Sequence, residues 1–385
     1  MSAVIHASRG PATPLPRFIG SEIYRHSSYG AWHPLRVPRV STVMDLARAM
    51  GWLPSAQFVN SPRAKPIALH GFHTPEYVAA LQAAEDAQAV TDHVRERHGL
   101  GTPSNPIFAE MYRRPATSAG AAMLAGELLA KGGVIYTPAG GTHHGLPDRA
   151  NGFCYLNDPV LAIQSLRRNG ARRIAYVDID AHHPDGVEHA FADDPDTLLI
   201  SVHEQNRWPR TGALTDRGVG QVYNLPVPPG LHDDDMALIR DQVILPLVAG
   251  FRPDAIVLQC GADAVAEDPQ SRLTLSNNAH WAIVAALGTL TSRYLVLGGG
   301  GYNPWSVGRL WTGVWATLTG AQIPDTLPDA AQDVLRALRW DGPKRARQPQ
   351  PHWIATLRDV PHNGPINADV RQRADALIAR ARAWV

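Results

Sequence analysis

The stretch Tyr176–Gly186 (YVDIDAHHPDG) places a hydrophobic run directly before a dense set of acids and histidines. The run Arg173–Asp180 is typical of a buried strand, and ionisable groups at the end of such a strand need partners or a metal ion. Residues two apart on a strand share a face, so Asp178, Asp180 and His182 can point into one pocket. Carboxylate and imidazole are ligands of Zn²⁺. The stretch therefore predicts a metal site; the alternative is solvated histidines beside a capping aspartate.

Three further polar clusters also follow apolar runs that are typical of strands. Gly140–Gly145 (GGTHHG) combines glycines, which allow a close backbone approach, with two histidines that titrate near neutral pH. Gln259–Asp263 (QCGAD) ends in a carboxylate, although the same residue could cap a helix. Leu297–Asn303 (LGGGGYN) has four glycines with no Lys-Ser/Thr after them, so a phosphate-binding P-loop is not expected. A flexible loop that places a tyrosine hydroxyl beside a substrate carbonyl fits this pattern better.

The elements that must position these clusters alternate between helix and strand. The patterns predict helices over 40–52, 75–84, 118–131, 159–168, 233–247 and 277–291, and strands over 133–137, 173–180, 197–203, 255–261 and 294–298. Continuously apolar strands such as AIVLQC and YLVLG indicate burial on both faces. We therefore expect an α/β fold in one domain over 1–385, with a mainly parallel, doubly wound sheet flanked by helices. In such sheets ligands bind beyond the carboxyl ends of the strands.

Composition narrows the class of protein. The 385 residues carry 36 Lys+Arg and 35 Asp+Glu, so no general attraction to nucleic acid or to an anionic membrane is expected. The two cysteines, Cys154 and Cys260, are too few for a disulfide framework and suit a reducing compartment. Residues 1–18 lack the apolar core of a signal peptide, and no apolar run reaches the roughly 18 residues of a membrane helix. We expect a soluble, cytoplasmic protein with no nucleic-acid or membrane partner; homo-oligomerisation stays open.

Five ordered motifs resemble those of zinc-dependent histone deacetylases, a superfamily that also contains acetoin-utilisation proteins and acetylpolyamine amidohydrolases. They are GGTHHG with NGFCYLND (Asn151–Asp158), DIDAHHPDG, SVH (Ser201–His203), GAD and GGGGY. The resemblance runs from about His33 to about Gly320 and implies the arginase/deacetylase fold. Residues 321–385 carry no family motif; we expect a helical extension there, with a basic, proline-containing linker at 341–351.

The resemblance implies one catalytic zinc ion and assigns roles to individual residues. The zinc ligands would be Asp180, His182 and Asp263. His144, partnered by Asp185, would be the general base and then the acid, and His143, partnered by Asp178, would give electrostatic support. Tyr302 would donate to the oxyanion. Ferrous iron remains an alternative to zinc, because ligand type alone does not settle the metal.

The family also has a narrow acyl-lysine tunnel and bound potassium. Phe153 and Trp208 would wall the tunnel, with Gly152 and Gly300 along it; core packing is the alternative for both aromatics. One K⁺ would be held by Asp178, the backbone of Asp180 and His182, Ser201 and the backbone of Val202. A second would lie near Phe191 and Tyr223.

The implied activity is the removal of an acyl group from an amine, with acyl-lysine as the leading substrate. An acetylpolyamine amidohydrolase is the alternative, for which Glu110 and Asp92 could supply acidic groups, although Arg113 and Arg114 nearby oppose binding of a polyamine cation. An arginase-type ureohydrolase would need two manganese ions and more carboxylates, and a non-enzymatic binding protein would need a missing catalytic residue.

Three departures from the family pattern bear on the substrate and the loop geometry. Pro184 replaces a glycine, and proline fixes φ and removes an N–H, which can shift the loop of Asp185. Gly101 stands where many relatives have an aspartate at the tunnel rim, which weakens the case for a protein substrate. Met111–Pro115 resembles the class IV branch, some members of which remove long acyl chains.

Overall fold

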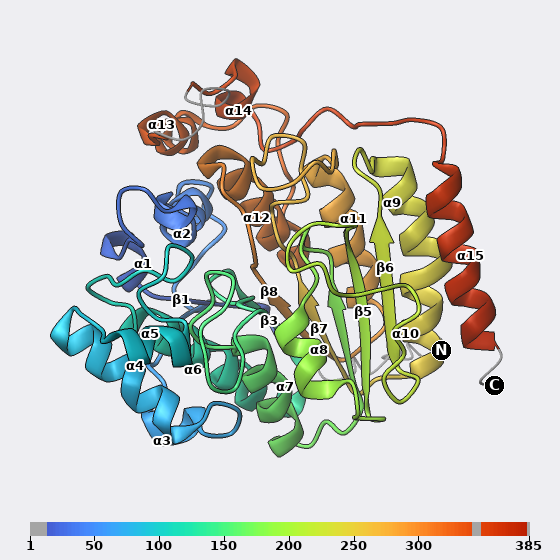
Figure 1. Cartoon of the computed structure of the whole chain (residues 1–385). Coiled ribbons are helices and arrows are strands. Elements are labelled where there is room, and N and C mark those ends of the chain that lie inside the picture. Colours follow the sequence, from blue (N-terminus) through green and yellow to red (C-terminus); the bar gives the residue numbers. More distant parts are fainter. Residues whose placement is uncertain (1–13, 341–347, 383–385) are drawn as a thin grey trace, which may run out of the picture.

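The computed structural model describes residues 14–340 and 348–382, and its strands form a single sheet (Figure 1). All neighbouring strands are parallel, in the order β2-β1-β3-β8-β7-β4-β5-β6, which confirms the predicted parallel α/β architecture. The strands are β1 (Arg17–Gly20), β2 (Phe58–Asn60), β3 (Gly133–Thr137), β4 (Ile174–Asp178), β5 (Thr197–Glu204), β6 (Val222–Val227), β7 (Ala255–Gln259) and β8 (Arg293–Leu297). Residues 1–13 and most of the predicted basic linker lie outside the described residues.

Helices cover both faces of the sheet, as the apolar strands predict. One face packs against α6 (Arg113–Leu128), α7 (Asp158–Arg168) and α8 (Asp185–Phe191). The other packs against α2 (Val40–Ala49), α9 (Asp233–Ile239), α10 (Leu245–Phe251), α11 (Asn277–Gly288), α12 (Pro304–Thr319) and α15 (Ala368–Arg382). Side chains alternate between the faces: on β4, Ile174 and Tyr176 join the first cluster, and Ala175 and Val177 join the second. Both faces of the strand are therefore buried.

The remaining helices are short or peripheral. They are α1 (Ile23–His26), α3 (Pro66–Leu69), α4 (Pro75–Ala87), α5 (Asp92–His98), α13 (Asp329–Ala337) and α14 (Pro351–Ala355). The predicted helix 233–247 is one uninterrupted helical run, in which a π-helical turn at Arg240–Ile244 joins α9 to α10. Within the described ranges, no helix combines the length and the apolar content needed to cross a membrane.

Helix α6 begins five residues before the predicted start at Ser118, and the cause lies outside the helix. The buried carboxylate of Glu85 accepts hydrogen bonds from the backbone N–H groups of Tyr112 (2.7 Å) and Arg113 (3.0 Å). Free N–H groups at a helix start need such acceptors. A carboxylate from α4 therefore caps α6.

The C-terminal segment packs back onto the sheet. Three aspartates at the start of α9 accept backbone N–H groups of this segment: Asp233 from His362 (3.0 Å), Asp234 from Gly364 (2.9 Å) and Asp235 from Asn367 (2.8 Å). Helix α15 then runs along the outermost strand β6 (Figure 1). There Arg373 donates to Pro226 O and Arg380 to Val222 O. The segment thus closes one edge of the sheet.

Candidate metal centre and substrate pocket

The four polar clusters singled out in the sequence follow β3, β8, β7 and β4, which are consecutive in the sheet. Because these strands are parallel, their carboxyl ends lie at the same edge. The topology therefore brings together segments that are far apart in the chain.

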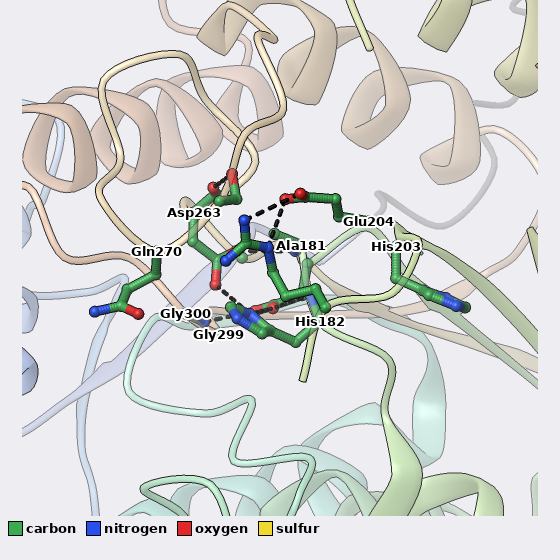
Figure 2. Close-up of polar contacts among 12 residues, drawn as sticks. Ala181, His182, His203, Glu204, Asp263, Gln270, Gly299 and Gly300 are labelled. Atoms are coloured by element: carbon green, nitrogen blue, oxygen red, sulfur yellow. Dashed lines mark hydrogen bonds and ion pairs between the residues drawn. The ribbon is translucent and has the colours of Figure 1, made fainter. Parts of the chain in front are cut away.

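Asp180, His182 and Asp263 form one buried group, with their ligand atoms within 4.8 Å of one another. His182 Nδ1 lies 3.2 Å from Asp180 Oδ1 and 3.0 Å from Asp263 Oδ2. Figure 2 shows the His182 and Asp263 side chains converging beside Gly299 and Gly300. Gly300 N donates to Asp180 Oδ2 at 2.6 Å, and a Cβ on Gly300 would lie only 2.0 Å from Asp263 Oδ2. Glycine is required there for the backbone to approach the carboxylates.

This group fits a catalytic metal ion. Burial alone would lower the pKa of His182, but the contacts with Asp180 and Asp263 raise it to about 10, so the cluster strongly favours positive charge. Two carboxylates and an imidazole suit zinc, and three protein ligands leave a coordination position open for substrate or water. Among the described residues, this is the one cluster of three or more potential ligands.

Two histidine–carboxylate pairs flank the metal group. His143 Nδ1 lies 2.8 Å from Asp178 Oδ2, and His144 Nδ1 lies 2.6 Å from Asp185 Oδ1. Burial works against a charge on either ring. At His143, Asp178 and Asp180 outweigh burial and raise the pKa to about 9. At His144, burial and the neighbouring His143 lower the pKa to about 4, despite Asp185. Either carboxylate fixes which ring nitrogen faces the pocket.

The metal group opens into a narrow pocket of about 30 Å³. Its lining includes His143, His144, Asp180, His182, Phe153, Tyr302, Tyr29, Leu35 and Arg39. Burial, followed by the field of Asp263, raises the pKa of Tyr302 well above 10, so its hydroxyl keeps its proton. The backbone N–H of Tyr302 is held by Asp268 Oδ2 at 2.7 Å. Tyr302 is thus available as a hydrogen-bond donor inside the pocket.

Of the two predicted tunnel aromatics, Phe153 lines the pocket, whereas Trp208 is more exposed and contacts two of the lining residues. The Phe153 ring is 6.0 Å from that of Tyr302, centroid to centroid. The indole of Trp208 meets the His144 ring edge-on at 4.6 Å, and Trp208 is 44% exposed. A Cβ on Gly152 would lie 2.1 Å from Trp208 Cη2, so only the bare backbone of residue 152 (φ 52°) fits beneath the indole. Trp208 therefore packs against two residues that line the pocket, His144 and Gly152, and is not a core residue.

The residues predicted to hold potassium are placed as follows. Asp178 and Ser201 are paired across β4 and β5, and Val202 is buried in β5. Phe191 and Tyr223 pack in clusters on opposite faces of the sheet. Potassium stays a prediction.

The structure accommodates two of the departures from the family pattern. Pro184 has φ −79° and ψ 62°, and Asp185 N donates to His183 O at 2.9 Å, which is an inverse γ-turn that suits proline. The turn leaves Asp185 in contact with His144. Gly101 has φ 74°, and a Cβ there would lie 2.8 Å from Val90. An aspartate at this position would be strained.

Several supporting residues carry no assignment from the sequence alone. Asn151 Nδ2 donates to Asp185 Oδ2 (3.0 Å), and the Tyr176 hydroxyl donates to Asp178 Oδ2 (2.6 Å). Asp158 accepts the N–H groups of Gly141 and Thr142 and so shapes the loop of the paired histidines. In the sequence, Asn151 and Asp158 could have been found as the polar residues at the two ends of the motif NGFCYLND. Nothing marks Tyr176, which lies inside an apolar strand.

Comparisons with known proteins agree with this geometry. A model of the histone deacetylase domain matches residues 33–318. The acetoin utilization protein AcuC of Bacillus subtilis is 32% identical over 325 residues, which cover 81% of this chain and 84% of that protein. Histone deacetylase 8 of Xenopus tropicalis is 33% identical over 303 residues, which cover 76% and 82%. Longer relatives are matched over less of their length, such as 60% of histone deacetylase 3 of Oryza sativa.

Solved structures match over nearly the whole chain. The crystal structure of an HDAC homolog from Aquifex aeolicus has a TM-score of 0.90 and 32% sequence identity, covering 95% of this chain and 100% of that one. An HDAC homolog complexed with SAHA has a TM-score of 0.89 and 33% identity. The structural match therefore extends beyond residues 33–318, which the domain model covers.

Proposed function

The chain belongs to the histone deacetylase family, and we propose that this deacetylase uses one zinc ion to hydrolyse the amide of an acetylated lysine side chain. The observation that supports this most directly is the convergence of three groups in one narrow pocket. Two of the three proposed metal ligands, Asp180 and His182, line it together with a pair of histidines and a protonated tyrosine. Amide hydrolysis needs these three components: a Lewis acid, a proton acceptor and a donor to the oxyanion.

Each side chain then has a role that follows from its surroundings. Zinc held by Asp180, His182 and Asp263 would polarise the amide carbonyl and lower the pKa of an attacking water. His144 is buried and neutral, so its ring nitrogen opposite Asp185 can accept the proton of that water and later pass it to the leaving amine. Tyr302 would donate to the developing oxyanion, and the positive charge on His143 would stabilise it further.

The small volume of the pocket supports a short acyl group. Free space of about 30 Å³ holds about two water-sized groups, which suits a methyl group but not a long chain. Tyr29, Leu35 and Arg39 line the same pocket, and Arg39 is tied to Gly299 O at 2.7 Å. Met111, from the class IV-like segment, is buried in the same hydrophobic cluster as Tyr29 and Leu35. We therefore propose acetyl in preference to long acyl groups.

A panel of substrates tests the proposal. We expect the zinc-loaded protein to show a higher kcat/KM on acetyl-lysine peptides than on long-acyl-lysine peptides, N-acetyl-lysine or N-acetylputrescine. A preference for N-acetylputrescine would instead support a polyamine substrate. We also propose that potassium binds at Asp178 and Ser201. A cytoplasmic location is a further proposal, which rests on the two buried free cysteines.

Tyr302→Phe is the sharpest single test of the mechanism. It removes one hydroxyl, and we expect kcat to fall on the order of 10²–10³, the usual effect of losing one oxyanion donor. Zinc content, measured by metal analysis, should not change. Asp263→Ala is the matched control, because it should lose zinc and turnover together. Near-normal turnover of Tyr302→Phe would remove this residue from the mechanism.

A further inference from the structure

The loop Glu204–Gly212 carries Trp208, which packs on the pocket residues His144 and Gly152, and the middle of this loop has an unfavourable backbone conformation. Asn206 and Arg210 have φ of 60° and 67°, in the left-handed region that residues with a Cβ rarely adopt. Such a conformation persists only where surrounding contacts hold it. The position of Trp208 therefore depends on contacts outside the loop backbone.

A buried carboxylate supplies such a contact. The Glu204 side chain is 4% exposed, and its two oxygens accept hydrogen bonds from Arg207 Nε (2.5 Å) and Nη2 (3.0 Å). The same carboxylate accepts the backbone N–H of Arg272 at 2.8 Å. A guanidinium that donates two bonds to one carboxylate is fixed in orientation. Because Arg207 directly precedes Trp208, this pair restricts where the indole can lie.

Glu204 also joins the loop to the metal group. Its backbone N–H donates to Ala181 O at 3.0 Å, between two of the predicted ligands. The segment containing Arg272 is tied to the third ligand, since Ser271 Oγ donates to the carbonyl of Asp263. Figure 2 shows Glu204 at one flank of the group that contains Asp263. One carboxylate thus links the wall of the pocket to its metal end.

We propose that Glu204 and Arg207 are positioning residues that hold Trp208 as a wall of the substrate pocket. The inference rests on the proposed function, because such a wall acts on the lysine stem that passes along it. In this arrangement the pair acts through Trp208 and affects substrate binding more than the chemical step.

Glu204→Gln tests the proposal, since it keeps the shape and one acceptor but removes the charge. On the zinc-loaded protein with an acetyl-lysine peptide, we expect KM to rise ~10-fold while kcat changes less than ~3-fold. Trp208→Ala should raise KM by at least as much, and adding Glu204→Gln to it should have little further effect. Asp45→Asn is the matched control. It breaks a two-bond Arg25–Asp45 pair on the surface of α2, and KM should not change.

A readout that is independent of turnover separates this proposal from the proposed function. We expect faster hydrogen exchange of the backbone amides of 205–211 in zinc-loaded Glu204→Gln than in the wild type or Asp45→Asn. Unchanged exchange would overturn the proposal, and so would a fall in kcat at constant KM, which would place Glu204 in the chemical step. If the wild type turned over no acetylated substrate, the proposed function would fail, while exchange would still decide whether Glu204 holds the loop.

Discussion

The two histidine–carboxylate pairs of the pocket have the same chemistry and lie side by side, yet they differ in charge. The rings of His143 and His144 are 4.0 Å apart, centroid to centroid, and each has a carboxylate on Nδ1. Against burial, Asp178 and Asp180 raise the pKa of His143 to about 9. Burial and the charge of His143 lower the pKa of His144 to about 4.

The difference arises around the pairs and not within them. His143 has two buried carboxylates near it, whereas His144 lies between two other histidines and the indole of Trp208. A cation bound by Asp180 would offset part of the negative charge of that carboxylate and so weaken its effect on the pKa of His143. The contact with Asp178 would still raise the pKa of His143 above that of His144. The deeper pair therefore keeps a fixed charge, and the outer pair is free to exchange a proton.

Replacing the rings should have the largest effect. We expect His144→Ala to lower kcat about 10³-fold or more, because it removes the group that carries the proton. His143→Ala should lower kcat about 10–10²-fold, since it removes a supporting charge. Steady-state kinetics at saturating peptide checks both. Equal losses would contradict the division of roles.

A third histidine sharpens the comparison, because its buried ring has backbone partners and no carboxylate. His73 Nε2 accepts the N–H of Asn157 at 2.9 Å, and Nδ1 lies 3.1 Å from Leu146 O. Burial lowers its pKa to about 4. Below about pH 6.5 His73 binds a proton in the unfolded chain but stays neutral in the folded protein. The free energy of unfolding should therefore fall as the pH falls from 6.5 to 4. The expected loss is about 3 kcal/mol.

Urea unfolding at pH 7 and pH 4.5 measures this loss. His73→Gln should lose less stability on acidification than the wild type does. His70→Gln, a change three residues earlier at a partly exposed histidine, serves as control and should behave as the wild type. An identical acid response in all three proteins would show that His73 does not contribute.

Neutralising the carboxylates should lower turnover less than replacing His144 does. Asp185→Asn should lower kcat on the order of 10–100-fold with zinc content unchanged, as expected when a partner that orients a catalytic imidazole is lost. Asp178→Asn should lower kcat by a similar factor and also lower the melting temperature, because Asp178 is fully buried and accepts the N–H of Asp180. A larger fall in melting temperature for Asp185→Asn than for Asp178→Asn would contradict this assignment of the two carboxylates.

The second partners of the carboxylates should give the smallest effect. Asn151→Ala removes one hydrogen bond, to Asp185, and Tyr176→Phe removes a hydroxyl that contacts both Asp178 and Gln259. A single hydrogen bond contributes about 1 kcal/mol, or roughly fivefold in rate. We expect Asn151→Ala to change kcat and Tyr176→Phe to change the melting temperature more than kcat. A larger effect of Tyr176→Phe than of Asn151→Ala on kcat would contradict the proposed difference between the two histidine–carboxylate pairs.

Local patterns predicted five of the eight strands of the described sheet, β3, β4, β5, β7 and β8, and the polar clusters behind four of them, because a buried strand has a clear apolar run and the ligands follow it directly. The short strands β1 and β2 were not predicted. They did not predict the contacts that support the site. Glu85 caps α6 and Glu204 binds Arg272 across long stretches of chain, and such pairs have no periodic signature. Strand β6 was missed because VYNLPV contains asparagine and proline. Proline is tolerated there because β6 lies at the sheet edge.

The cover on β6 has a consequence for synthesis. Parallel edge strands expose unpaired backbone groups that can recruit another chain. Here the arginines of α15 occupy carbonyls of β6, and α15 lies far downstream of that strand in the sequence. While the ribosome is still making the intervening residues, the sheet therefore has an open edge that its own chain cannot yet close. Aggregation of nascent or truncated chains should begin at this strand.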